Sequence, residues 1–314
     1  MSDLDIHEIK SSKTKIRNPP RAEDDIIPKL GTSVIFNGTT GMGKSTLMTN
    51  LLTEDRFYPD DTFTHKFLFS PTAEGDDVQK QLNIPKKNTF TNLSEAPYYL
   101  NIIMETQKKK IKKKGSDKAP QILIVYDDVI SDPAFMRADE FIKSFIASRH
   151  YNLTVMIATQ SWTSVPRRCR IQARNIFFFA APQSEVEKLC EEHCPPRFTK
   201  KQFFAMVQWA TAKPYSFLYI NKTVPMKERY RKNLTEIINL DAFRNLTMKD
   251  SARGYEERLD HILNIDSDNN DSGQDGDSDR RSVKRRRPAS NDRRRRLRSR
   301  GGRQQENDDS GSES

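Results

Sequence analysis

The sequence has no long hydrophobic run and few cysteines, and both absences limit what the protein can be. No apolar stretch approaches the ~20 residues that cross a bilayer, and the longest are ILIVY and IFFFAA. The first ten residues, MSDLDIHEIK, lack the apolar core of a secretory signal. The three cysteines cannot all pair within one molecule, which fits a reducing compartment. We therefore expect a protein that is neither secreted nor inserted in a membrane.

Positive charge is in excess and is unevenly distributed. The formal net charge is +10. Residues 280–303 contain thirteen Lys or Arg and one acid, and they lie between acidic flanks with six acids in residues 264–279 and four in residues 304–314. Together residues 264–314 contribute +2, which leaves +8 for residues 1–263. A basic body favours a polyanionic partner such as nucleic acid, although ordinary soluble domains reach similar values.

Short apolar segments alternate with helical ones along most of the chain. Strands that are hydrophobic on both faces and separated by helices predict an α/β fold, with a mostly parallel central sheet and helices on both faces. The expected strands are TSVIFNG, THKFLFS, QILIVYDD, LTVMIATQ, RNIFFFAA and PYSFLYIN. The expected helices are residues 44–53, 96–110, 133–148, 183–192 and 199–209.

Composition divides the chain into four parts. Residues 1–28 are polar and proline-containing, and we expect a flexible N-terminal arm. Residues 29–245 should form the α/β domain and residues 246–263 a C-terminal helix. Residues 264–314 have too few apolar side chains to pack, so we expect a disordered acidic–basic–acidic tail.

The segment GTTGMGKS, residues 38–45, matches the phosphate-binding loop G-x-x-x-x-G-K-[ST] in full, between an apolar strand and a helix. Its glycines let backbone N–H groups and the helix N-terminus face phosphate oxygens. Lys44 is expected to reach the β- and γ-phosphates of ATP, and the Ser45 hydroxyl to bind Mg²⁺. The expected nucleotide-binding residues are Gly38, Thr39, Thr40, Gly41, Met42, Gly43, Lys44, Ser45 and Thr46.

Two acids follow a later apolar strand, QILIVYDD. They are expected at the carboxyl edge of the sheet, where open α/β folds bind their ligands. We expect Asp127 to hold the Mg²⁺ together with Ser45, and Asp128 to orient or deprotonate the attacking water. The alternative for Asp128 is a cap on the turn that follows it.

Gln160 ends the next apolar strand, and Arg149 precedes that strand. Gln160 could sense the γ-phosphate or position water, or it could make an ordinary hydrogen bond at the strand end. Arg149 could enter the site of a neighbouring subunit, where such arginines raise phosphoryl-transfer rates roughly 10³–10⁵-fold. The alternative for Arg149 is a simple interaction with a helix dipole.

Two further basic segments precede and follow these motifs. KKKIKKKG, residues 108–115, is expected to link a helix to the Asp127 strand, either as a solvated loop or as a DNA contact. Four arginines after Gln160 could contact DNA, a neighbouring subunit or phosphate: Arg167, Arg168, Arg170 and Arg174. The arginine-rich tail resembles a bipartite nuclear-import signal and is also typical of a nucleic-acid tether.

Four segments, GTTGMGKST, QILIVYDDVI, SRHYNLTVMIATQSWTSVP and KPYSFLYIN, resemble the poxvirus-type genome-packaging ATPases, within the HerA–FtsK class of DNA-pumping P-loop proteins. The resemblance covers about residues 29–225. It implies a P-loop NTPase of the additional-strand, RecA-like type that forms a homo-oligomeric ring. It also implies that ATP hydrolysis drives double-stranded DNA into a preformed capsid.

On this resemblance Lys44 and Ser45 bind nucleotide and magnesium, Asp127 and Asp128 form the acidic pair, Gln160 is the sensor, and Arg149 is supplied in trans. The sequence departs from the family in two ways. The second acid is Asp128, where many hydrolytic relatives carry the longer Glu, and a long tail follows residue 263.

Two other functions stay open at this point. A nucleotide or nucleoside kinase would use the same loop, but we find no arginine-rich lid with a base pocket. A nucleic-acid-binding regulator with a nucleotide switch is disfavoured by the intact Lys44, Ser45 and Asp127. The expected partners are double-stranded DNA, further copies of the chain and capsid proteins, with no membrane. The expected location is the virion and the host cell, with the host nucleus or a viral factory as the site of action.

Overall fold

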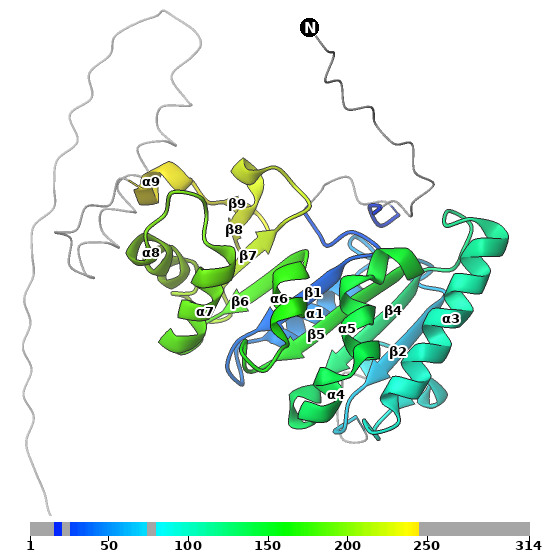
Figure 1. Ribbon diagram of the computed structural model, residues 1–314. Helices are drawn as coiled ribbons and strands as arrows, with labels where there is room; N and C mark the ends of the chain where they lie inside the picture. The colour runs from blue at the N-terminus through cyan, green and yellow to red at the C-terminus, as the bar shows by residue number, and fades with distance from the viewer. Residues whose placement is uncertain (1–15, 21–25, 74–79, 245–314) are drawn as a thin grey trace, which may run out of the picture. The chain divides into compact units, whose positions relative to one another are not determined.

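A nine-stranded sheet forms the centre of the described part of the chain (Figure 1). The computed structural model describes residues 16–20, 26–73 and 80–244. The strand order across the sheet is β3 (Thr89–Phe90), β2 (His65–Phe69), β4 (Ile122–Asp127), β5 (Leu153–Thr159), β1 (Ser33–Asn37), β6 (Asn175–Phe179), β7 (Phe217–Asn221), β8 (Tyr230–Lys232) and β9 (Glu236–Ile237).

The first six strands in that order run parallel, and β7, β8 and β9 pair antiparallel. This arrangement confirms the predicted mostly parallel sheet. β5 lies between β1, which leads into the phosphate loop, and β4, which ends in Asp127. That inserted strand is the feature expected of an additional-strand P-loop fold.

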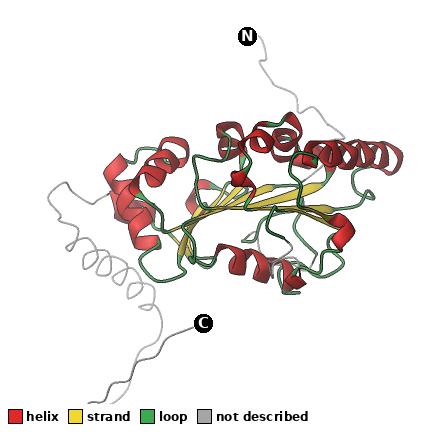
Figure 2. Cartoon of the chain, turned by 90° about the horizontal axis from the view of Figure 1, so that it is seen from below, coloured by secondary structure: helices red, strands yellow, loops and turns green. Residues whose placement is uncertain are grey.

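Helices cover both faces of the sheet (Figure 2). They are α1 (Lys44–Thr53), α3 (Ala96–Lys114), α4 (Pro133–Arg137), α5 (Asp139–Ile146), α6 (Arg167–Gln172), α7 (Gln183–His193), α8 (Lys200–Ala210) and α9 (Leu240–Arg244). Within the described ranges no helix is long and apolar enough to span a membrane.

The alternation of side chains along each strand divides the core in two. Ile35 and Ile124 belong to one cluster, which also contains side chains of α3, α5 and α8. Phe36 and Val125 belong to the other, which contains side chains of α1. Because both faces of the central strands are buried, their carboxyl ends are held in fixed positions at one edge.

Two helices differ from their predicted extents. The predicted helix 133–148 is divided in two because Ala138 has extended backbone angles between α4 and α5. α3 continues to Lys114, four residues beyond the predicted helix end at residue 110, so the solvated-loop alternative was wrong for all of residues 108–115 but Gly115. Lysine is a good helix former, and three lysines in the last turn interact favourably with the helix dipole.

The packed domain begins earlier than the predicted boundary at residue 29. Ile27 is buried. The Tyr219 hydroxyl donates to the Ile26 carbonyl at 2.7 Å, and the Tyr58 hydroxyl donates to the Pro28 carbonyl. Residues 26–28 therefore belong to the domain and not to a flexible arm. The predicted helix 246–263 and the predicted tail 264–314 lie outside the described residues.

Candidate functional site

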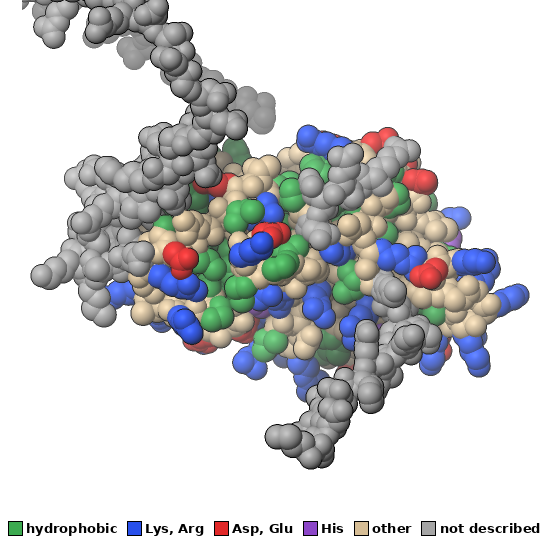
Figure 3. All heavy atoms as spheres, turned by 90° about the horizontal axis from the view of Figure 1, so that it is seen from above, with side chains coloured by type: hydrophobic (Ala, Val, Ile, Leu, Met, Phe, Trp, Pro, Cys, Tyr) green, Lys and Arg blue, Asp and Glu red, His purple; other side chains and the backbone are tan. Residues whose placement is uncertain are grey.

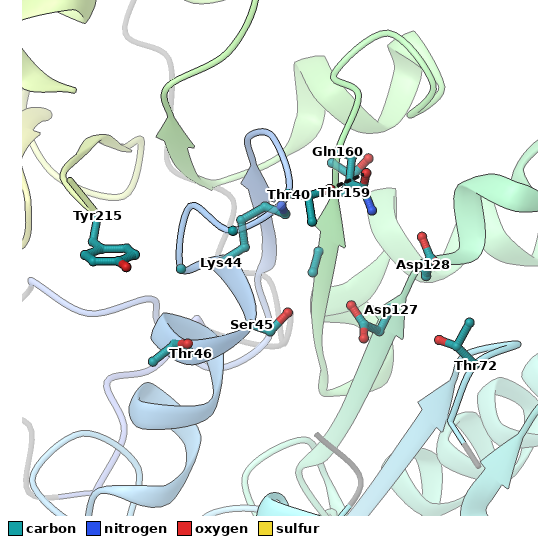
Figure 4. Close-up of a pocket in the computed structure, with 13 residues that line it drawn as sticks. Thr40, Lys44, Ser45, Thr46, Thr72, Asp127, Asp128, Thr159, Gln160 and Tyr215 are labelled. Atoms are coloured by element: carbon teal, nitrogen blue, oxygen red, sulfur yellow. Dashed lines mark hydrogen bonds between the residues drawn. The ribbon is translucent and has the colours of Figure 1, made fainter. Parts of the chain in front are cut away.

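A cavity of about 480 Å³ lies where β1, β4 and β5 end, at the carboxyl edge of the parallel strands (Figure 4). It is lined by Thr40, Gly41, Gly43, Lys44, Ser45, Thr46, Thr72, Asp127, Asp128, Ala158, Thr159, Gln160 and Tyr215. The structure thus brings together most of the residues that the sequence singled out from three separate segments. Gly38, Thr39 and Met42 belong to the loop but do not line the cavity, and Arg149 is not among the lining residues.

The phosphate loop is anchored between β5 and β6. Its first N–H, from Gly38, donates to the Thr159 carbonyl at 3.2 Å, and the next, from Thr39, donates to Ala180 at 3.3 Å. A Cβ on Gly38 would lie only 2.6 Å from the Phe179 Cβ, so no larger residue fits there. α1 then begins at Lys44, after Gly43 in the left-handed conformation (φ 87°), and no described side chain caps it. Its first N–H groups can therefore bind an anion.

Lys44 is buried beside the acidic pair. Its Nζ donates to the Thr39 carbonyl at 2.8 Å, across the loop. Burial lowers the pKa of Lys44, and the negative charges of Asp127 and Asp128 partly offset that decrease. Because its ammonium group has lost much of its hydration, a bound phosphate would strongly stabilise the charged form of Lys44.

Asp127 and Asp128 occupy different backbone environments at the end of β4. Asp127 is the last strand residue and is buried. Asp128 has φ 52°, in the left-handed region that non-glycine residues seldom occupy. Its side chain makes no cap hydrogen bond, and Asp132 instead caps α4 by accepting from the Ala134 and Phe135 N–H groups. The turn-cap alternative for Asp128 is therefore not what the structure shows.

The donor chemistry of the cavity suits a magnesium ion bound together with phosphate. Ser45 and Asp127 offer oxygen atoms from α1 and β4 on neighbouring sides of the cavity (Figure 4). Mg²⁺ prefers oxygen ligands and is usually held by one or two carboxylates, substrate phosphates and water. No three His, Cys, Asp or Glu residues in the described ranges form a metal cage. Ser45 and Asp127 therefore fit a cation whose remaining ligands are phosphate and water.

Gln160 connects the end of β5 to the phosphate loop. The Thr40 hydroxyl donates to Gln160 Oε1 at 2.9 Å, and the Gln160 side chain is otherwise exposed at the cavity. The neighbouring Thr159 hydroxyl donates to the Ser161 carbonyl at 2.9 Å, so both polar side chains at this strand end have a hydrogen-bond partner. The Gln160 amide is thus placed where it can donate to a phosphate or to water.

The loop after Gln160 is fixed by a carboxylate from α7. Glu185 accepts hydrogen bonds from the backbone N–H groups of Trp162 and Thr163 and from the hydroxyls of Ser161 and Thr163. These contacts hold the chain directly after Gln160 in one conformation. Glu185 is a positioning residue that the sequence did not indicate, because it lies 25 residues downstream on a helix.

Arg170 also fixes this loop. Its guanidinium donates to the carbonyls of Trp162, Thr163 and Val165 and pairs with Glu192 at 2.7 Å, with both side chains of that pair nearly fully buried. The sequence suggested a contact with DNA, a subunit or phosphate for Arg170, and the structure gives it a structural role instead. Nothing in the local sequence indicated a partner on α7.

Glu192→Ala is expected to lower the stability of the domain by about 3–5 kcal/mol, because it leaves the buried Arg170 charge without its partner. At roughly 2–4 °C per kcal/mol, the melting temperature should fall by about 10 °C. Thermal unfolding followed by circular dichroism measures the change. Glu191→Ala is the matched control, since Glu191 is the neighbouring exposed acid that pairs with Lys188. Equal melting temperatures for the two variants would contradict the structural role of the pair.

Arg149 lies far from the cavity of its own chain. It is exposed in the 3₁₀ helix Ser148–Tyr151, directly before β5. β5 has seven residues, so at ~3.3 Å per residue it spans about 20 Å between Arg149 and the cavity. No arginine side chain can cover that distance, so Arg149 cannot act in its own site.

Four lining residues are absent from the predicted site: Ala158 and Thr159 at the end of β5, and Thr72 and Tyr215. Thr72 follows β2, and Tyr215 lies in the turn before β7. Neither belongs to a recognisable phosphate-site motif. Tyr215 belongs to KPYSFLYIN, one of the segments that carry the family resemblance, but the sequence predicted a strand there, and β7 begins only at Phe217.

Comparison with known proteins gives a family match and distant structural likenesses. The model of the family described as Poxvirus A32 protein matches residues 28–239. No curated protein matches the chain. One similar solved structure is the genome packaging NTPase B204 from Sulfolobus turreted icosahedral virus 2 in complex with AMP, with 14% identity over 61% of this chain and 93% of that chain and a TM-score of 0.43.

Two further structures show the same level of likeness. B204, the DNA-packaging ATPase from Sulfolobus Turreted Icosahedral Virus, has 13% identity over 62% of this chain and 93% of that chain, with a TM-score of 0.43. EssC (ATPases 2 and 3) from Geobacillus thermodenitrificans has 16% identity over 80% of this chain and 52% of that chain, with a TM-score of 0.45. The family match, in contrast, spans more than half of the chain, and this chain therefore belongs to the Poxvirus A32 protein family.

Proposed function

We propose that this protein is an ATP-hydrolysing motor that translocates double-stranded DNA and packages a viral genome into a preformed capsid. The observation that carries the proposal is the convergence of Lys44, Ser45, the Asp127–Asp128 pair and Gln160 on one cavity. Membership of the Poxvirus A32 family supports a viral setting. The sequence resemblance to packaging ATPases supports duplex DNA as the cargo.

The polar residues that converge on the cavity have different proposed roles in ATP hydrolysis. Lys44 and the first N–H groups of α1 bind the β- and γ-phosphates, and Ser45 and Asp127 hold the magnesium ion. Bound magnesium neutralises negative charge on the phosphate oxygens. Asp128 orients the attacking water and accepts its proton as the water oxygen bonds to the γ-phosphorus and the bond to ADP breaks. Gln160 donates to a γ-phosphate oxygen.

Arg149 extends this site across a subunit boundary. Because it is exposed at the amino end of β5, it is free to contact a second copy of the chain. A closed ring forms when this end of one subunit faces the cavity of the next, in a head-to-tail arrangement. The arginine then stabilises the charge that develops on the transferred phosphoryl group.

The surface charge and the family of the protein support two proposed partners, DNA and capsid proteins. Lysine and arginine side chains are scattered over the face in Figure 3 and can contact the DNA backbone. Capsid proteins are the proposed second partner. The proposed location is the virion and the infected host cell, in a viral factory or the nucleus.

The ATPase rate with and without long duplex DNA tests the proposal. DNA should raise the rate several-fold in the wild type, and Lys44→Ala should hydrolyse no ATP under either condition. Phosphate transfer to a nucleoside would overturn the proposal in favour of a kinase. Nucleotide-dependent DNA binding without hydrolysis would favour a regulator.

A further inference from the structure

Tyr215 lines the cavity on the side of the phosphate loop that lies away from Asp127 and Asp128 (Figure 4). It is the only aromatic among the described residues that line this cavity. A Cβ added to Gly43 would lie 3.3 Å from Tyr215 Cδ1 and 3.8 Å from its Cβ. The ring therefore lies directly against the residue that precedes Lys44, and Gly43 leaves room for it.

In the turn that contains it, Tyr215 adopts an unfavourable backbone conformation. The Ser216 N–H donates to the Lys213 carbonyl at 3.1 Å, which closes a turn with Pro214 in second place and Tyr215 in third. Tyr215 has φ 64°, a conformation for which the third turn position normally uses glycine. A bulky residue kept in this region points to a functional requirement for its side chain.

Hydrogen bonds, and not packing of the ring, fix this turn. The Ser216 hydroxyl donates to the Lys213 carbonyl at 2.6 Å and accepts from the Lys213 N–H at 3.1 Å, and Ser216 is buried. Tyr215 itself is 68% exposed, the largest exposure of the large hydrophobic residues in the described ranges. An aromatic face is thus held open to solvent at the edge of the cavity.

We infer that Tyr215 is the platform on which the base of the bound nucleotide stacks. This inference rests on the proposed nucleotide site. When the γ-phosphate faces Asp127, Asp128 and Gln160, the other end of the nucleotide leaves the loop on the opposite side, where Tyr215 lies (Figure 4). Stacking on an aromatic ring contributes to the affinity for any base, because every base has a π face.

Binding of ATP and of inorganic tripolyphosphate, each with Mg²⁺, tests this inference. Tripolyphosphate occupies the phosphate loop but has no base. Tyr215→Gly suits the positive φ and removes the ring, so it does not endanger the turn. It is expected to raise the Kd of ATP about 5- to 150-fold and to leave the Kd of tripolyphosphate unchanged. Tyr215→Phe keeps the stacking face and should bind ATP like the wild type.

The outcomes separate this inference from the proposed function. Equal losses of ATP and tripolyphosphate affinity in Tyr215→Gly would show that the ring supports the loop, and would overturn the inference. Unchanged ATP affinity in that variant would overturn it as well. Lys44→Ala should weaken both ligands, and if it weakens neither, the proposed nucleotide site itself fails.

Discussion

Replacing Arg149 with alanine is expected to lower the ATPase rate of the assembled protein by about 10³-fold or more, although Arg149 lies about 20 Å from the cavity of its own chain. The reason is that the transferred phosphoryl group loses a cationic partner that only a neighbouring subunit can supply. ATP binding should change little, because Lys44 and the loop of the same chain remain intact. A steady-state phosphate-release assay measures the rate.

Mixing two inactive variants distinguishes an arginine acting in trans from a structural one. In a mixed ring, a Lys44→Ala subunit offers its Arg149 to the intact cavity of an Arg149→Ala subunit. The mixture should therefore regain ATPase activity that neither variant has alone. If the mixture stays inactive, or if Arg149→Ala alone keeps the wild-type rate, the trans role is refuted.

Two further variants test the helix-dipole alternative for Arg149. Arg149→Lys keeps the positive charge but loses the planar guanidinium that binds phosphate oxygens in pairs. The dipole interpretation expects this variant to be active, and the trans role expects a large loss. Arg56→Ala is the matched control, since Arg56 is an exposed arginine that follows α1 and pairs with Glu54. It should keep the wild-type rate.

The parts of the site that the sequence predicted are those set by local rules. The glycine spacing and the Gly-Lys-Ser order define the phosphate loop without any knowledge of the rest of the chain. Asp127 and Gln160 could be placed because each ends an apolar strand, and parallel strands end at one edge of a sheet. The periodicity of apolar residues and the turn signals between them were sufficient to predict the mostly parallel sheet.

The parts that were missed depend on contacts between distant segments. Arg170 looked like a surface cation because its partner Glu192 lies 22 residues downstream, on another helix. Tyr215 reaches the loop at Gly43 from a turn that is far away in the sequence. The lysines of α3 were misread for a different reason: repulsion between like charges was given more weight than helix propensity and the helix dipole.

Asp128→Asn is expected to lower kcat by about 10²–10⁴-fold with little change in the KM for ATP, because the amide cannot accept a proton from water. The substitution suits the position, since Asn tolerates the left-handed conformation that Asp128 adopts at φ 52°. A loss of rate in this variant therefore reports the missing carboxylate and not a distorted turn. Single-turnover measurements at saturating ATP separate the chemical step from binding.

Two comparisons decide how that loss is interpreted. Asp132→Asn changes an acid four residues away that caps α4, and because Asn caps helices equally well, the rate should not change. Asp127→Asn should be partly rescued by a higher Mg²⁺ concentration, since Asp127 is the proposed metal-binding acid, whereas Asp128→Asn should not respond. If Asp128→Asn keeps the wild-type rate, the water is activated by another group and the proposed role of Asp128 is refuted.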